Sequence, residues 1–307
     1  MQRKLISFDW AIKRILRSKA NFDILEGFLS ELLKEDIKII EILESESNQD
    51  ILNDKFNRLD LKVKNQNNEI ILIEIQYSAE LDYLQRILYA SSKAITEHMK
   101  EGMAYSNISK VISISILYFD FGDGDDYIYK GTTNFIGLHN KTTLKLNEKQ
   151  KELYKTNLVE KIYPKYYLIK VRNFDDNAKD TLDEWINFLK NETIPENPKA
   201  KGLLKASQEL DYLKMSKEEQ LLYDKHEQDR HHEASIYEST YVIGEIMGMK
   251  KERLNSERKL KEEKIKSEIK LKEEKINIAK NLLDVLDVET ISLKTGLSIE
   301  DVESLKK

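Results

Sequence analysis

The stretch RLDLKVKNQNNEIILIEIQ, residues 58–76, contains two runs of alternating apolar and polar residues around an asparagine-rich centre. Such alternation is typical of a β-hairpin that buries one face. A turn in this centre that keeps both apolar faces on one side of the sheet pairs Leu61 with Ile73, and therefore Asp60 with Glu74. The hairpin thus predicts two carboxylates side by side on the polar face of a sheet.

Patterns on both sides of the hairpin predict an α/β fold. Apolar residues recur at helical spacing in some segments, and β-branched residues gather or alternate in others. We expect helices over residues 8–18, 21–35, 81–102 and 181–192, and further strands over 37–45, 110–119, 126–138 and 163–174. This order predicts a mixed sheet flanked by helices.

The chain after this region has a different character. Pro195, Pro198 and Gly202 lie close together and mark a candidate linker, and only helical patterns follow. We predict four parts, which are an α/β domain over 1–194, a linker and helical segment over 195–244, a long charged helix over 245–278 and a helix-turn-helix-like tail over 279–307.

The charged helix carries an internal repeat. KLKEEKI occurs at 259–265 and again at 270–276, and a period of eleven residues favours a slightly right-handed supercoil. We therefore expect a coiled coil and a homodimer through the C-terminal helices, along a thin apolar seam of Leu254, Leu260, Ile265, Ile269, Leu271 and Ile276. In the tail, the second helix is acidic, which favours packing or dimerisation over DNA reading.

Composition limits the protein class. The chain has 307 residues, no cysteine and a net charge of −5, which excludes disulfides and thiolate zinc sites. The net charge also argues against coating nucleic acid through a global positive field, whereas it allows basic contacts confined to one cleft. No apolar run is long enough to span a membrane, and the N-terminus lacks a signal-type apolar core. We expect a cytoplasmic protein.

The carboxylate pair suggests chemistry. Asp60 and Glu74 would repel each other unless a positive charge lay between them, and a hard divalent cation with oxygen ligands supplies it. Gln76 points to the same side and can hold a water or a phosphate oxygen. The reaction class that follows is metal-assisted hydrolysis. The alternative is a solvated hairpin face on which both carboxylates form salt bridges with Arg58 or Lys62.

The order of these residues resembles a known family. Asp60, thirteen intervening residues, Glu74, one residue and Gln76, between an earlier helix and a later long one, resemble the core of PD-(D/E)XK nucleases. More narrowly, the chain is similar to the PD-(D/E)XK nuclease family transposases, or recombination-promoting nucleases. The resemblance covers most of the first two hundred residues, including FDWAIKRIL and YLQRILYA, and extends to the charged helix and tail.

The resemblance implies a restriction-endonuclease-like fold and a metal-dependent DNA endonuclease connected with recombination or mobile elements. It implies Mg²⁺, with Mn²⁺ as a substitute, bound by Asp60 and Glu74. Gln76 stands where most of the superfamily has lysine, and Leu59 replaces the proline before the aspartate. Because glutamine offers a neutral dipole in place of a charge, it weakens the expected activity.

Other residues are candidates for supporting roles. Glu26 is a candidate third metal ligand, as in some members of the superfamily. Arg86, Gln85 and Arg58 are candidate contacts to DNA phosphates. Two other functions stay open at this point. One is a nuclease-fold protein of weak or no activity that binds DNA or oligomerises, and the other is an adaptor that acts through its C-terminal helices.

Overall fold

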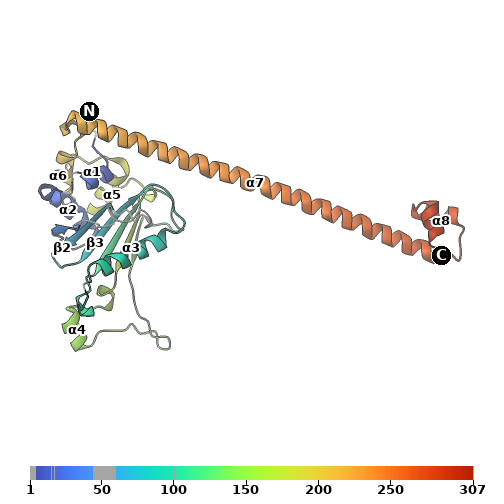
Figure 1. Ribbon diagram of the computed structural model, residues 1–307, viewed down its shortest axis with the longest axis horizontal. Helices are drawn as coiled ribbons and strands as arrows, with labels where there is room; N and C mark the ends of the chain where they lie inside the picture. Colours follow the sequence, from blue (N-terminus) through green and yellow to red (C-terminus); the bar gives the residue numbers. More distant parts are fainter. Residues whose placement is uncertain (1–4, 15, 17, 44–59, 100, 307) are drawn as a thin grey trace. The chain divides into compact units, whose positions relative to one another are not determined.

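The computed structural model describes residues 5–14, 16, 18–43, 60–99 and 101–306 (Figure 1). The chain divides into two compact units, Met1–Ala234 and Ser235–Lys307, which are treated separately below.

The first unit is built on a mixed six-stranded sheet with the order β1-β2-β3-β4-β6-β5. Strands β1, β2 and β3 are antiparallel neighbours, β3, β4 and β6 are parallel, and β5 pairs antiparallel with β6 at the edge. Their bounds are Ile39–Ile42, Leu61–Asn65, Ile70–Gln76, Val111–Leu117, Ile128–Gly131 and Lys165–Lys170 for β1 to β6. The sheet confirms the predicted mixed α/β architecture.

The hairpin of β2 and β3 has the predicted register, because Leu61 pairs with Ile73. Burial of the apolar face excludes a slip of one residue, which would turn that face toward the opposite side, and the position of the turn selects this alignment among the rest. The turn is closed by Asn65, whose Oδ1 accepts hydrogen bonds from the N–H groups of Asn67 and Glu69, at 3.0 and 2.9 Å. Asn68 takes the left-handed conformation, with φ 59°, that asparagine tolerates better than most residues.

Helices cover both faces of the sheet (Figure 1). The main core lies on one face, where β-strand residues pack with α1 (Phe8–Arg14), α2 (Phe22–Leu33), α5 (Thr181–Asn191) and α6 (Leu203–Glu209). The long α3 (Tyr83–Glu97) covers part of the other face. The remaining helical segments are α4 (Glu148–Tyr154) and the 3₁₀ turns Lys19–Asn21, Tyr105–Asn107, Val159–Lys161, Val171–Asn173 and Tyr212–Lys214.

The candidate linker region contributes to this main core. Ala200, Leu203, Ala206 and Leu210 are buried in it together with residues of α1 and α2. The first part of the segment 195–244 therefore packs against α2. The boundaries of the four predicted parts stay predictions.

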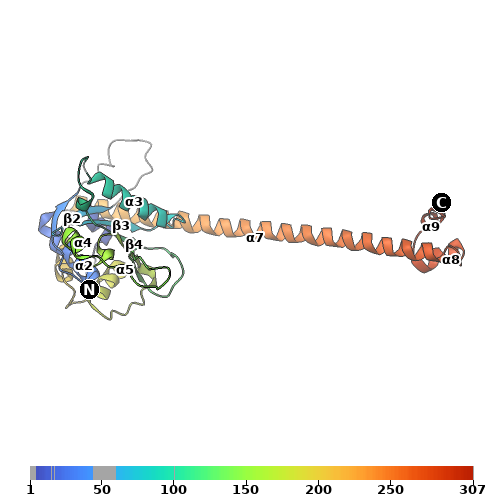
Figure 2. The same cartoon turned by 90° about the horizontal axis from the view of Figure 1, so that it is seen from below.

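The second unit contains the outer part of α7 (Lys217–Leu282) followed by α8 (Val288–Thr295) and α9 (Ile299–Ser304), and Figure 2 shows α7 as an uninterrupted helix. The sequence of α7 contains no proline and is rich in charged residues. Pairs such as Arg253–Glu257, four residues apart, also suit a continuous exposed helix. Asp287 and Ser298 cap α8 and α9 through their side chains. Within the described residues, no helix is long and apolar enough to cross a membrane.

Candidate active site

Asp60 and Glu74 lie together at the open end of the hairpin. Because Leu61 and Ile73 pair with their side chains in the main core, the residues next to them point to the opposite face, toward α3. The Oδ2 atom of Asp60 accepts a hydrogen bond of 2.6 Å from the N–H of Ile75, which ties the start of β2 to β3. Glu74 is only 3% exposed. The alternation of β2 and β3 therefore brings the two carboxyl groups to one site.

The environment of Glu74 is that of a carboxyl group kept out of water. Burial raises its pKa to about 7, and the neighbouring charge of Asp60 acts in the same direction. The charge of Arg86 and a hydrogen bond from Tyr83 oppose this rise. The Arg86 guanidinium forms an ion pair with Oε1 of Glu74, and the Tyr83 hydroxyl donates to Oε2 at 3.3 Å. Glu74 is thus a buried carboxyl group whose charge needs a positive partner.

Tyr83 and Arg86 reach the site from the first turns of α3. Tyr83 is fully buried, and its ring packs edge-on against Phe119 and Phe121. Burial raises its pKa, so the hydroxyl keeps its proton and acts as a donor. The sequence pattern predicts a helix here but gives no sign that Tyr83 contacts Glu74, because that contact depends on how α3 packs on the sheet.

Gln76 follows Glu74 on the same face and joins the same network. Its side-chain amide donates to Oε1 of Glu80 at 3.0 Å and to the carbonyl of Ser78 at 3.2 Å. Arg86 donates to the same oxygen of Glu80 at 2.6 Å. Glu80 is therefore a site residue that sequence reasoning missed. Its only signal in the sequence is that it is an acidic residue in the short connection between the strand that carries Glu74 and the next helix.

The donor set fits a hard divalent cation. Oε1 of Glu74 is buried and accepts no hydrogen bond, although it is paired with Arg86. Oxygen ligands from two carboxylates are what Mg²⁺ takes from many proteins, with water and phosphate completing its shell. No group of three or more His, Cys, Asp or Glu side chains suited to a metal occurs among the residues that the structure describes. The protein's share of a metal site would therefore be Asp60 and Glu74.

Glu26, the candidate third ligand, lies elsewhere. Its Oε1 accepts a hydrogen bond of 2.9 Å from the N–H of Ile39, and its Oε2 is bound by Lys38 at 2.8 Å. Ile39 pairs with Asn65, at the turn end of the hairpin. Since strands rise about 3.3 Å per residue, this end is roughly 16 Å from Asp60. The structure therefore does not bring Glu26 to the carboxylate pair, and its carboxylate instead anchors β1 to α2.

The other candidates have different surroundings. Gln85 is exposed on α3 next to Arg86, whose side chain is 22% exposed. Arg58 lies outside the described residues. Lys62 forms a salt bridge of 2.7 Å with Glu97 of α3. Glu74 is buried. The alternative of a solvated hairpin face, on which Lys62 pairs with the two carboxylates, therefore does not describe this face.

A second polar cluster lies on the opposite face of the sheet. Asp9 of α1 forms a contact of 2.7 Å with Nε2 of His226, near the start of α7. Arg230 donates to the hydroxyl of Tyr77 at 3.0 Å, and the Tyr77 ring stacks on that of Tyr118. Tyr77 directly follows Gln76, so this cluster fixes the base of α7 behind the strand that carries the candidate site.

Comparison with known proteins identifies a similar family. A family model described as "PD-(D/E)XK nuclease family transposase" matches residues 6–240, a range that contains the whole sheet, the carboxylate pair and Arg86. No curated protein and no solved structure shows a significant match to this chain.

Proposed function

Since the chain belongs to the family of PD-(D/E)XK nuclease transposases, we propose that it is a metal-dependent DNA endonuclease that hydrolyses phosphodiester bonds at the Asp60–Glu74 pair. The family is one of nucleases linked to mobile elements, and DNA is the substrate that it suggests. The observation that carries the proposal is the meeting of Asp60, Glu74 and Gln76 on one face of the hairpin, beside Arg86.

Each side chain has a defined task in this proposal. Asp60 and Glu74 would hold the divalent cation, Mg²⁺ or Mn²⁺, which when bound supplies a more acidic water and offsets charge on the phosphate. The Ile75 N–H orients Asp60, and the Tyr83 hydroxyl orients Glu74. The amide of Gln76 can donate to a water or a phosphate oxygen.

Contacts to the DNA strand would come from the start of α3. Arg86 is partly exposed and has two carboxylate partners, so it can bind a phosphate without leaving both of them. Exposed Gln85 and the sequence candidate Arg58 would add further phosphate contacts. These contacts are confined to one small region, which is compatible with the negative net charge of the chain.

The second candidate function is DNA binding with weak or no cleavage. It is favoured by Gln76, because a neutral amide stabilises the developing charge less well than the lysine usual in the superfamily. In both candidate functions the ligand is DNA, and the two differ only in whether the bound DNA is cut.

Supercoiled plasmid cleavage distinguishes the two candidates. We expect nicking or linearisation with Mg²⁺ or Mn²⁺, loss of cleavage with a chelator, and a fall of about 100-fold or more in Asp60→Asn. Asparagine keeps the shape of the side chain and an oxygen for the Ile75 N–H. The matched control is Glu41→Gln on β1, an exposed carboxylate of the same sheet. Equal cleavage by wild type and Asp60→Asn would contradict the proposal, and DNA binding without cleavage would favour the second candidate.

We also propose that the protein forms a homodimer through α7. Ile243, Leu254, Ile265 and Ile276 recur every eleven residues, and the first three are 52%, 58% and 56% exposed. An apolar stripe at this period suits a slightly right-handed supercoil with an identical helix. Burying the stripe against a second copy removes apolar surface from water, which is the main stabilising contribution in such pairs.

A further inference from the structure

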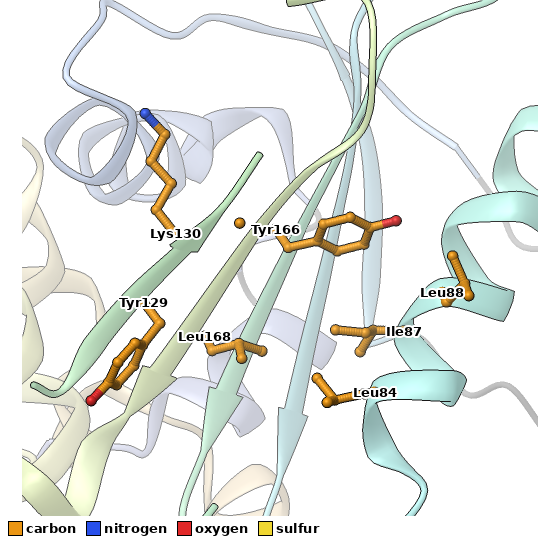
Figure 3. Close-up of a pocket in the computed structure, with 8 residues that line it drawn as sticks. Leu84, Ile87, Leu88, Tyr129, Lys130, Tyr166 and Leu168 are labelled. Carbon is orange, nitrogen blue, oxygen red and sulfur yellow. The ribbon is translucent and has the colours of Figure 1, made fainter. Parts of the chain in front are cut away.

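An apolar groove lies beside the candidate active site. It has a volume of about 370 Å³ and is lined by α3 on one side and by β5 and β6 on the other (Figure 3). Its walls are formed by Leu84, Ile87, Leu88, Tyr129, Lys130, Gly131, Tyr166 and Leu168. Figure 3 shows the Tyr166 ring pointing toward the leucines of α3, across the groove. We call this the α3–β6 groove.

The register of the sheet connects this groove to the carboxylate pair. Glu74 of β3 pairs with Ser115 of β4, which pairs with Leu168 of β6, which pairs with Tyr129 of β5. Paired residues of neighbouring strands point to the same face, and strands lie about 4.8 Å apart. Leu168 is therefore about 10 Å from Glu74 along one row of the sheet, two strand spacings away.

The helix provides a second connection. Leu84 and Ile87 of α3 line the groove, whereas Tyr83 and Arg86, which immediately precede them, contact Glu74. One helix thus borders both the candidate catalytic site and the groove. A DNA strand whose phosphate lies beside Arg86 and continues along this face meets the groove within one or two nucleotides.

The lining favours a flat, uncharged ligand. Lys130 contributes to the wall, but its side chain points away from the groove (Figure 3), in agreement with its pairing with Tyr167 of the main core. The other side chains of the wall are apolar or aromatic. A phosphate would be poorly solvated there, whereas a nucleobase can stack on a tyrosine ring and contact leucine side chains.

Positive charge on the groove's own face of the sheet comes from Arg86, which lies beside the carboxylate pair on the helix that lines the groove. Lys130 and Lys165 pair with Tyr167 and Ile112 of the main core, so their side chains lie on the opposite face of the sheet. A guanidinium beside an apolar groove is complementary to a nucleic-acid strand, with a phosphate outside and a base inside.

We propose that the α3–β6 groove binds an unstacked nucleobase of the DNA strand whose phosphate lies at the Asp60–Glu74 pair, so that single-stranded or locally unpaired DNA is the preferred substrate. The inference rests on the proposed nuclease function and specifies its substrate. In an intact duplex the bases are stacked and paired, and none can enter the groove without first leaving the helix.

The test compares two DNA strands of equal length, one with bases and one fully abasic. Binding of the full-length protein is measured by fluorescence anisotropy in a chelator, so that neither strand is cut. Tyr166→Ala is expected to weaken binding of the base-containing strand by about 5- to 150-fold, the range for loss of one stacked base, and to leave binding of the abasic strand unchanged. Tyr105→Ala is the control, because Tyr105 is 81% exposed and does not line the groove.

Three results would overturn the proposal. The first is no effect of Tyr166→Ala on either strand, and the second is an equal loss on both strands, which would indicate a general disturbance. The third is a lower particle mass in Leu84→Glu with unchanged DNA binding, which would assign the groove to a second copy of the chain. Plasmid cleavage by the same wild-type sample tests the nuclease function separately, so cleavage without a base-dependent effect of Tyr166→Ala rejects only the base-binding groove.

Discussion

At the scale of single residues, Glu74 illustrates how the fold changes the chemistry of a side chain. An exposed glutamate on a hairpin would be charged at neutral pH, whereas burial raises the pKa of Glu74 to about 7. The charge of Arg86 compensates only in part, because the effect of burial on this pKa is larger. In the metal-free protein, ionisation of Glu74 therefore lowers the stability of the folded state.

We predict that this cost makes the metal-free protein less stable as the pH rises. The folded-state pKa of about 7 exceeds the usual value of 4.5, so between these pH values the folded state binds the proton that the unfolded state has lost. The free energy of unfolding should fall as pH rises from about 4.5 to 7, by at most about 3 kcal/mol. Urea unfolding in a chelator at pH 5 and pH 8 measures this change.

The control for this prediction removes the titrating group. Between pH 5 and pH 8, the free energy of unfolding should fall less in Glu74→Gln than in wild type, because the contribution of Glu74 is removed. In Glu41→Gln, it should fall by the same amount as in wild type. Parallel profiles of wild type and Glu74→Gln would show that the carboxyl group of Glu74 does not titrate abnormally in the folded state.

At the scale of helices and strands, the backbones of α2 and the start of α6 lie so close that there is no room for a side chain between them. A Cβ atom at Gly27 would lie 2.2 Å from the carbonyl oxygen of Lys201 and 2.7 Å from Cα of Gly202. Both are backbone atoms, which cannot rotate away as a side chain can. Gly202 itself has φ 78°, a conformation that favours glycine. The absence of a Cβ atom at Gly27 therefore permits the close packing of the start of α6 on α2.

Gly27→Ala is therefore expected to destabilise the first unit by about 2–3 kcal/mol, because two helices must move apart to admit one methyl group. Thermal or urea unfolding followed by circular dichroism measures this loss. Gly131→Ala is the matched control in the same unit. Its Cβ would meet Tyr166 at 3.4 Å, an ordinary contact, so its effect should stay within about 1 kcal/mol. A Gly27→Ala protein as stable as the control would mean that α2 and α6 are not held this closely.

At the scale of the whole molecule, the chain combines an α/β unit with an exposed helix that has little core of its own. Among the described residues beyond 240, the buried apolar side chains are confined to a small cluster, which contains Ala279, Ile291, Leu297 and Val302. Exposed apolar residues continue along α7 from Ile243 to Ile278. The proposed association with an identical helix would bury those of them that lie on the eleven-residue stripe, Ile243, Leu254 and Ile265.

We predict that the double variant Leu254→Gln, Ile265→Gln shifts the protein from dimer to monomer. Both residues lie on the eleven-residue stripe, and glutamine preserves helix propensity while removing the apolar surface. Sedimentation equilibrium measures the particle mass at a fixed protein concentration. Leu204→Gln is the control, because this leucine is 55% exposed on α6 of the first unit. An unchanged mass in the double variant would reject pairing through this stripe.

Local sequence patterns alone determined much of this protein. Period-2 alternation and the asparagine-rich turn together predicted the pairing of Leu61 with Ile73 and placed Asp60 and Glu74 on one face. Burial of a single face excludes a slip of one residue, and the position of the turn selects among the remaining alignments. The tail helices begin at Asp287 and Ser298 because their side chains satisfy free N–H groups one turn ahead. Such features depend on neighbours within a few residues, and these are visible in the sequence.

Only the tertiary structure decided the rest. It placed Glu26 at the far end of the hairpin, paired Arg86 with Glu74, and inserted β6 between β4 and β5. It also made the strand predicted over 126–138 shorter, as β5 covers Ile128–Gly131. These outcomes depend on which surfaces pack together across long sequence separations. Side-chain spacing within one segment carries no information about that packing, since the same amphipathic helix can approach a sheet in many positions.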